Sequence, residues 1–81
     1  MRVTVRLFAR LGDVAGASEL AREIAAGATI GSVWQELTRD YPGLAPYERS
    51  ISSAVNLDYA RMDRAVSDGD EIAFLPPVSG G

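Results

Sequence analysis

The chain has 81 residues, which is enough for one small domain and no more. Hydrophobic residues make up 47% of the sequence and the formal net charge is −3, a balance that excludes intrinsic disorder for most of the chain. The excess of acidic residues argues against a nucleic-acid-binding protein, because such proteins normally carry a basic stripe.

Three residue types that often carry chemistry are missing. The sequence contains no cysteine and no histidine, and all 8 basic residues are arginine, so lysine is absent as well. The chain therefore has no thiolate nucleophile, no imidazole base or metal ligand, and no side-chain amine for acyl transfer. We expect no metal site and no enzyme that acts on its own.

The N-terminal region predicts neither a secretion signal nor a membrane anchor. Arg2, Arg6 and Arg10 interrupt the apolar run that a signal peptide needs. The longest uncharged stretch runs from Ile24 to Gln35 and is well short of the ~20 apolar residues of a membrane span. We therefore expect a cytoplasmic protein with no membrane partner and no nucleic-acid partner.

Segment 2–9 alternates between apolar and polar residues, as a half-buried strand does. The apolar face of this strand carries Val3, Val5 and Leu7. Phe8 breaks the pattern, because it falls on the polar face. Segment 10–16 fits one or two helical turns with Gly16 as the stop.

Segment 18–25 is ambiguous from its own residues. Helix propensity favours a helix. A strand would place Leu20, Arg22 and Ile24 on one face, where a charged side chain such as Arg22 is awkward. On this segment alone a helix is the better prediction.

Segment 29–41 is the clearest helix. Its apolar residues form one continuous face at helical spacing: Ile30, Val33, Trp34, Leu37 and Tyr41. Thr29 fits the N-cap position, and the Pro42-Gly43 pair ends the helix just before it. We interpret the apolar face as core packing against a sheet, with Trp34 as an anchor.

Two further strands are predicted in the C-terminal half. Segment 51–57 is rich in small and β-branched residues. Segment 71–75 alternates, with Ile72 and Phe74 on one face and Ala73 and Leu75 on the other. Segment 58–66 predicts only a short irregular stretch with Met62 and Val66 turned inward, followed by a turn at 67–70.

The last residues, Pro76-Pro77-Val78-Ser79-Gly80-Gly81, carry no charged side chain. The two prolines keep the chain extended as it leaves the final strand. The two glycines lack a Cβ, so the backbone can enter a narrow channel and the terminal carboxylate is unhindered. The pattern is that of a carboxylate held away from the domain on a stalk.

This ending resembles that of a known family. The segment from Asp68 to Gly81 is similar to the C-terminus of the small subunits of molybdopterin synthase, which are ubiquitin-like sulfur carriers. Further similarity lies in three short motifs: Leu7-Phe8-Ala9, Tyr41-Pro42-Gly43-Leu44 and Ala54-Val55-Asn56. The resemblance extends over essentially the whole chain.

The resemblance implies an α+β fold of the ubiquitin-like β-grasp type, in which a mixed sheet carries one main helix across one face. It makes 18–25 the second strand, against the helix propensity of that segment. It also implies a β-grasp domain at 1–75 and a flexible Gly-Gly tail at 76–81. The expected core comprises Val3, Val5, Leu7, Leu20, Ile30, Val33, Trp34, Leu37, Val55, Ile72 and Phe74.

The resemblance also implies a function. An ATP-dependent enzyme similar to ubiquitin-activating enzymes would adenylate Gly81, and a sulfur donor would convert the adenylate to a thiocarboxylate. The tail, with Gly80, Ser79, Val78 and Pro77, would insert into the large catalytic subunit of the synthase, in an expected heterotetramer, and supply sulfur for the dithiolene of molybdopterin. The ATP is used by the activating partner, and no cofactor is bound permanently.

A surface for the partner is expected on the outer face of the sheet. Phe8 and Leu75 both lie opposite the core-facing residues of their strands. The first and last strands of a β-grasp sheet are adjacent, so these two side chains can meet. The resemblance adds Tyr59 to this surface.

Three other functions stay open at this point. A related sulfur carrier in thiazole synthesis or tRNA thiolation has the same fold and the same Gly-Gly end. A ubiquitin-like protein modifier would be joined through Gly81 to lysines of other proteins. A binding module would leave the tail without a role.

Overall fold

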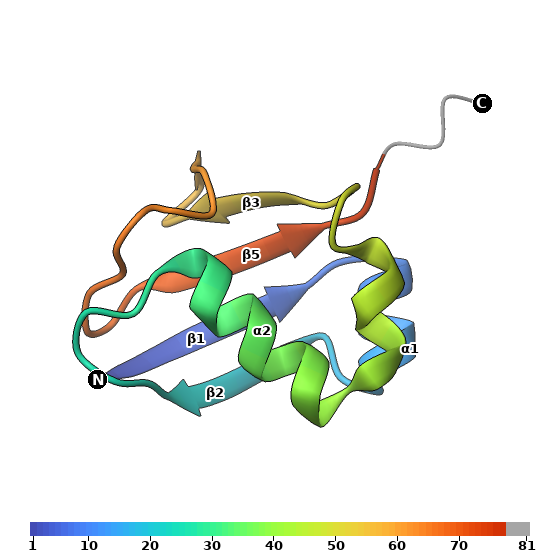
Figure 1. The fold of residues 1–81 in the computed structure, drawn as a ribbon, viewed down its shortest axis with the longest axis horizontal. Coiled ribbons are helices and arrows are strands. Elements are labelled where there is room, and N and C mark those ends of the chain that lie inside the picture. The colour runs from blue at the N-terminus through green and yellow to red at the C-terminus, as the bar shows by residue number, and fades with distance from the viewer. Residues whose placement is uncertain (78–81) are drawn as a thin grey trace.

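The computed structural model describes residues 1–77, whose path is drawn in Figure 1. The elements in chain order are β1 (Arg2–Leu7), α1 (Arg10–Ala15), β2 (Glu19–Glu23), α2 (Ile30–Asp40), the 3-10 helix η1 (Pro42–Tyr47), β3 (Ser52–Val55), β4 (Asp58–Tyr59) and β5 (Glu71–Leu75). None of the helices in these 77 residues combines the length and the apolar character that crossing a membrane requires.

The strands form one 5-stranded mixed sheet in the order β2-β1-β5-β3-β4. The first and last strands, β1 and β5, are parallel neighbours, and the other pairs are antiparallel. α2 crosses one face of the sheet, whereas α1 and η1 lie at the end toward which β1 and β5 run (Figure 1). The expected mixed sheet with one main helix is confirmed. The side of the sheet away from α2 is called the outer face below.

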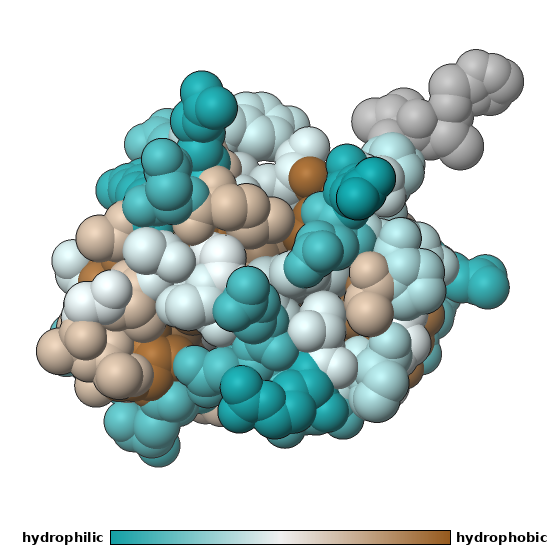
Figure 2. All heavy atoms as spheres, in the orientation of Figure 1, coloured by the Kyte–Doolittle hydropathy of each residue, from teal (hydrophilic) through white to brown (hydrophobic). Residues whose placement is uncertain are grey.

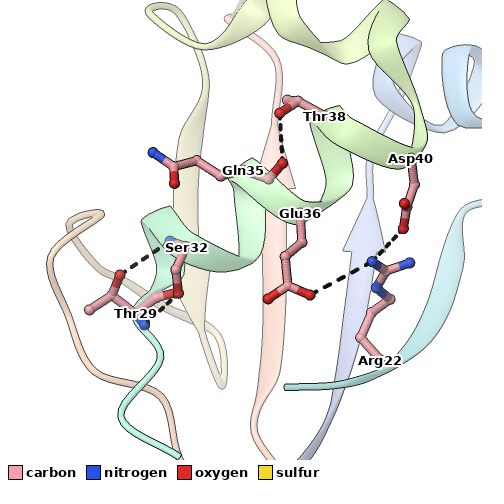
Figure 3. A network of polar contacts seen from close by, with 7 residues as sticks. All are labelled: Arg22, Thr29, Ser32, Gln35, Glu36, Thr38 and Asp40. Carbon is pink, nitrogen blue, oxygen red and sulfur yellow. Dashed lines mark hydrogen bonds and ion pairs between the residues drawn. The ribbon is translucent and has the colours of Figure 1, made fainter. Parts of the chain in front are cut away.

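α2 begins and ends where its sequence predicts. The Thr29 hydroxyl accepts a hydrogen bond from the Ser32 amide at 3.2 Å, and the Ser32 hydroxyl accepts one from the Thr29 amide at 2.9 Å (Figure 3). This reciprocal pair satisfies backbone donors that would otherwise be unpaired at the first turn. The apolar side of the helix is buried, and the Trp34 ring packs against Phe74 of β5 with 5.0 Å between the ring centroids.

β2 is a strand, as the family resemblance implies, so the helix prediction from propensity is wrong. Its residues pair in register with β1, Leu20 lying opposite Val5. Arg22 points toward the helix side, where its Nη2 lies 2.5 Å from Asp40 Oδ2 and 4.0 Å from Glu36 Oε1 (Figure 3). These two carboxylates of α2 explain how an arginine fits on the inner side of an edge strand, since its charge is paired there.

The core lies between α2 and the sheet. All predicted core residues are buried except Leu20, which is half-buried because β2 is an edge strand. The list of expected core residues omits five buried apolar residues: Leu11, Ile24, Leu44, Ala54 and Val66. Of these, only Val66 is predicted from its own segment to turn inward. Leu11 on α1 and Leu44 on η1 come from elements too short to show an apolar period, so nothing in the local pattern marks them as core.

The predicted strand 51–57 is shorter in the structure, because β3 ends at Val55. Asn56 and Leu57 both have positive φ, 51° and 75°, and form a two-residue turn into β4. The prediction of an irregular stretch directly after 57 is therefore wrong for β4. Farther along, Val66 is buried and Met62 is half-buried, as predicted.

Candidate functional site

The strand register determines which side chains share the outer face. Residues directly opposite one another in neighbouring strands point to the same side of a sheet. Arg6 of β1 lies opposite Ala73 of β5, which lies opposite Ala54 of β3, which in turn lies opposite Tyr59 of β4. The middle of the outer face is therefore lined by two alanines, between an arginine on one side and a tyrosine on the other.

Phe8 and Leu75 lie beside each other at the end of the same face. The register of β1 and β5 pairs Leu7 with Phe74, so the next residue on each strand is Phe8 and Leu75 respectively. The Phe8 side chain is 40% exposed and Leu75 is half-buried. Two apolar side chains thus flank the point where β5 leaves the sheet.

Tyr59 lies on the same face but at a distance from this pair. It stands on β4, the edge strand, so β3 lies between it and Leu75. At a spacing of ~4.8 Å per strand, the separation across the sheet is about 10 Å. The Tyr59 side chain is 80% exposed and borders a hollow of about 340 Å³ that Arg61 and Met62 also line. The structure therefore brings Phe8 and Leu75 together and leaves Tyr59 apart.

The helix side of the molecule has a different surface. Figure 2 shows this side, where the strongly hydrophobic colour appears only in small separate areas and hydrophilic residues gather over the middle. Arg22, Glu36 and Asp40 form their ion-paired cluster on this side. The expected pair of outward apolar residues on adjacent strands belongs to the outer face.

One feature of the site is absent from the sequence-based prediction. The guanidinium carbon of Arg6 lies 5.5 Å from the centroid of the Phe8 ring. The alternation of segment 2–9 places both residues on the polar side of the strand, which is the only signal that could have suggested this contact. Side-chain torsions decide the contact itself, and no sequence pattern fixes them.

The predicted tail residues fall largely beyond the described part of the chain. Pro76 is half-buried and Pro77 is exposed, directly after β5. The rest of the predicted tail lies outside the described residues 1–77: Val78, Ser79, Gly80 and Gly81. Residues 1–77 contain no group of three or more carboxylates that could hold a metal ion.

The topology defines a class of protein: a ubiquitin-like β-grasp domain. The ThiS family matches residues 5–81, and the chain belongs to this family.

Relatives with established names support the same placement. The molybdopterin synthase sulfur carrier subunit of Chlamydomonas reinhardtii is 34% identical over 83 residues, covering 100% of both chains. The protein of that name from Escherichia coli K12 is also 34% identical, covering 98% of this chain and 99% of the relative. Among solved structures, small archaeal modifier protein 1 from Haloferax volcanii is 31% identical, with a TM-score of 0.86 and 100% of both chains covered.

Proposed function

We propose that this protein is the sulfur carrier subunit of a molybdopterin synthase, and that Gly81 carries the sulfur as a thiocarboxylate. The observation that carries the proposal is full-length similarity to proteins of that name, at 34% identity, in a chain that ends in Gly-Gly. The absence of cysteine supports it, because no side chain of this protein can hold a persulfide.

The chemistry requires an activating partner. A free carboxyl terminus is ionised at neutral pH and is a poor electrophile. In the first step a Gly81 carboxylate oxygen attacks the α-phosphorus of ATP, which forms the acyl adenylate and releases pyrophosphate. In the second step hydrosulfide (HS−), delivered by the sulfur donor, attacks the acyl carbon and AMP leaves, and loss of the remaining proton gives the thiocarboxylate. The chain lacks histidine, the most common general base, and lysine, so we infer that the partner enzymes provide the catalytic groups for both steps.

The large subunit of the synthase is the second partner, and the outer face is its proposed docking surface. Phe8 and Leu75 lie where β5 ends, directly before Pro76-Pro77, so a large subunit that covers them also receives the tail. Tyr59 extends the same face toward the edge strand. We propose that residues 1–75 act as the rigid docking domain and that 76–81 is the flexible segment that enters the active site of the large subunit.

Mass spectrometry of the intact protein tests the first half of this proposal. The chain is incubated with an adenylating enzyme, ATP and a sulfur donor, and its mass should show one oxygen replaced by sulfur, located in the C-terminal peptide. The matched control carries one extra residue after Gly81, which keeps the fold and removes the reactive carboxylate from its position. Equal loading of the extended protein, or sulfur on an internal residue, contradicts the mechanism.

The second half of the proposal, that the loaded protein supplies sulfur to molybdopterin synthase, is tested by measuring molybdopterin formation. Loaded protein mixed with the large synthase subunit and cyclic pyranopterin monophosphate should yield molybdopterin. Loading without product formation points instead to a carrier for thiazole synthesis or tRNA thiolation. The experiment therefore separates the sulfur-carrier chemistry from the particular pathway that it serves.

A protein modifier is the second candidate, because of the similarity to small archaeal modifier protein 1. In that case the activated Gly81 carbonyl would be attacked by a lysine amine of another protein, with release of AMP. Incubation with the adenylating enzyme, ATP and a lysate would then give ladders of higher mass that carry the C-terminal peptide. A thiocarboxylate without such conjugates favours the carrier function.

A further inference from the structure

The guanidinium group of Arg6 lies over the aromatic ring of Phe8 on the outer face of the sheet. Arg6 and Phe8 are two residues apart, and the Phe8 amide continues the pairing with β5 just beyond the end of β1, so both side chains point toward the outer face. The distance of 5.5 Å from the guanidinium carbon to the ring centroid is within the ~6 Å reach of a cation–π contact. Phe8 is 40% exposed, so the pair is accessible to a partner.

The guanidinium of Arg6 has no carboxylate partner among residues 1–77. Glu19 lies opposite Arg6 in the register of β1 and β2. The ion pairs in this part of the chain nevertheless join Arg2 to Glu23 and Arg22 to the carboxylates of α2, and none includes Arg6. The group is therefore directed along the strand to Phe8 rather than across the sheet to Glu19.

A stacked guanidinium keeps its hydrogen-bond donors. Its N–H groups lie in the plane of the group, while the flat face covers the aromatic ring. A carboxylate can approach in that plane and accept two N–H bonds without displacing the ring. On the neighbouring strand β5, the outward residues near Arg6 are Ala73, which lies opposite it, and Leu75, and both are uncharged. Arg6 is thus a charged residue beside the apolar pair that can recognise a charged group of a partner.

We infer that Arg6 recognises an aspartate or glutamate carboxylate that the large synthase subunit presents beside its apolar contact with Phe8 and Leu75. The inference rests on the proposed function, since it specifies a chemical feature of that partner. Arg6 thereby selects a partner surface that combines an apolar area with one negative charge. A surface that is apolar throughout, or that carries a cation at this place, leaves the guanidinium unpaired or repelled.

Binding kinetics of three proteins to the purified large subunit test the inference: wild type, Arg6→Gln and Arg6→Lys. Gln keeps a polar side chain but removes the charge and the two-donor geometry. Arg6→Gln should bind about tenfold more weakly, chiefly through faster dissociation, because truncating one member of a hydrogen-bonded charge pair acts on the dissociation rate. Arg6→Lys should recover only part of the affinity, because an ammonium group makes neither the paired N–H contact nor the flat stacking.

Arg2→Gln is the matched control. Arg2 lies on the same strand and the same face, away from Phe8, and it pairs with Glu23. Its replacement removes the same charge and should leave the affinity within about twofold of wild type, because exposed ion pairs contribute little. Equal losses in Arg2→Gln and Arg6→Gln would indicate a general charge effect and overturn the inference, as would wild-type affinity and dissociation rate in Arg6→Gln.

Failure of the inference and failure of the proposed function give different results. If wild-type protein binds the large subunit and Arg6→Gln binds it equally well, only the role of Arg6 is wrong. If wild-type protein fails to bind the large subunit at all, the proposed function is wrong and the inference falls with it. Adenylation of Gly81 in the three proteins, measured by intact mass, verifies that the variants are folded and active as carriers.

Discussion

The backbone amide of Phe8 donates a hydrogen bond of 3.2 Å to the carbonyl oxygen of Phe74. This bond continues the parallel pairing of β1 and β5 by one residue, although β1 ends at Leu7. Ala9 then turns the chain into α1 with a φ of 50°, a region that residues with a side chain rarely adopt. Phe8 is therefore held on the sheet, beside Leu75, by a backbone contact that does not depend on its ring.

This relationship makes the proposed docking role of the outer face testable by truncation. Because the backbone of Phe8 stays in place, Phe8→Ala removes the ring without changing the strand pairing. Phe8→Ala and Leu75→Ala should each weaken binding to the large synthase subunit by about 1–3 kcal/mol, the range of an interface anchor. Isothermal titration calorimetry measures the loss.

Leu57→Ala is the control for this pair of variants. Leu57 is 89% exposed, on the turn between β3 and β4, and removal of its side chain should leave the affinity unchanged. If all three variants bind like wild type, the apolar pair on the outer face is not the docking surface.

The sequence predicts those parts of the fold that depend on local signals. α2 is recovered because Thr29 caps it and its apolar residues repeat at helical spacing. β2 is not recovered from its own residues, because Arg22 fits there through Glu36 and Asp40, which lie far along the chain on α2. β4 has two residues, too few for any alternation to appear. The outward position of Phe8 follows from counting along β1, whereas its contact with Arg6 depends on side-chain torsions.

The two arginine ion pairs of β1 and β2 should differ in their effect on stability. The Arg22 side chain is 22% exposed and connects the edge strand to α2, whereas the Arg2 side chain is 70% exposed. Arg22→Ala should lower the free energy of unfolding by about 1 kcal/mol, because it removes the partly buried ion pair with Asp40 and the packing of the aliphatic part of the Arg22 side chain. Arg2→Ala should cost less than about 0.5 kcal/mol. Urea unfolding of both variants measures the difference, and equal losses would contradict this account.

The turn between β3 and β4 carries a residue that is poorly suited to its backbone. Leu57 has a φ of 75°, and it is 89% exposed, so its side chain packs against little of the protein. A left-handed conformation costs a residue with a Cβ about 1–2 kcal/mol, and glycine avoids that cost. Leu57→Gly should therefore raise the free energy of unfolding by about 0.5–1 kcal/mol after the larger chain entropy of glycine is subtracted.

Leu57→Ala separates the backbone effect from the loss of the side chain. Alanine keeps the Cβ that strains this position, so its stability should stay close to wild type. Thermal unfolding followed by circular dichroism compares the three proteins. Stabilisation by alanine as large as that by glycine would show that the exposed side chain, and not the backbone, is the source of the cost.

The Gly-Gly ending should be sensitive to a single added methyl group. Gly80→Ala places a Cβ next to the terminus that we propose to be reactive, where the proposed narrow active-site channel of the partner would leave no room for it. Because a misplacement of about 1 Å can cost 100-fold in rate, sulfur loading and transfer should fall by about that factor.

Ser79→Ala is the control, since it removes one hydroxyl and adds no bulk, and it should load at nearly the wild-type rate. The rates come from intact mass spectrometry over time, and both variants should unfold at the wild-type temperature because 76–81 is proposed to lie outside the folded domain. Loading of Gly80→Ala at the wild-type rate would show that a glycine at position 80 is not required for entry into the channel.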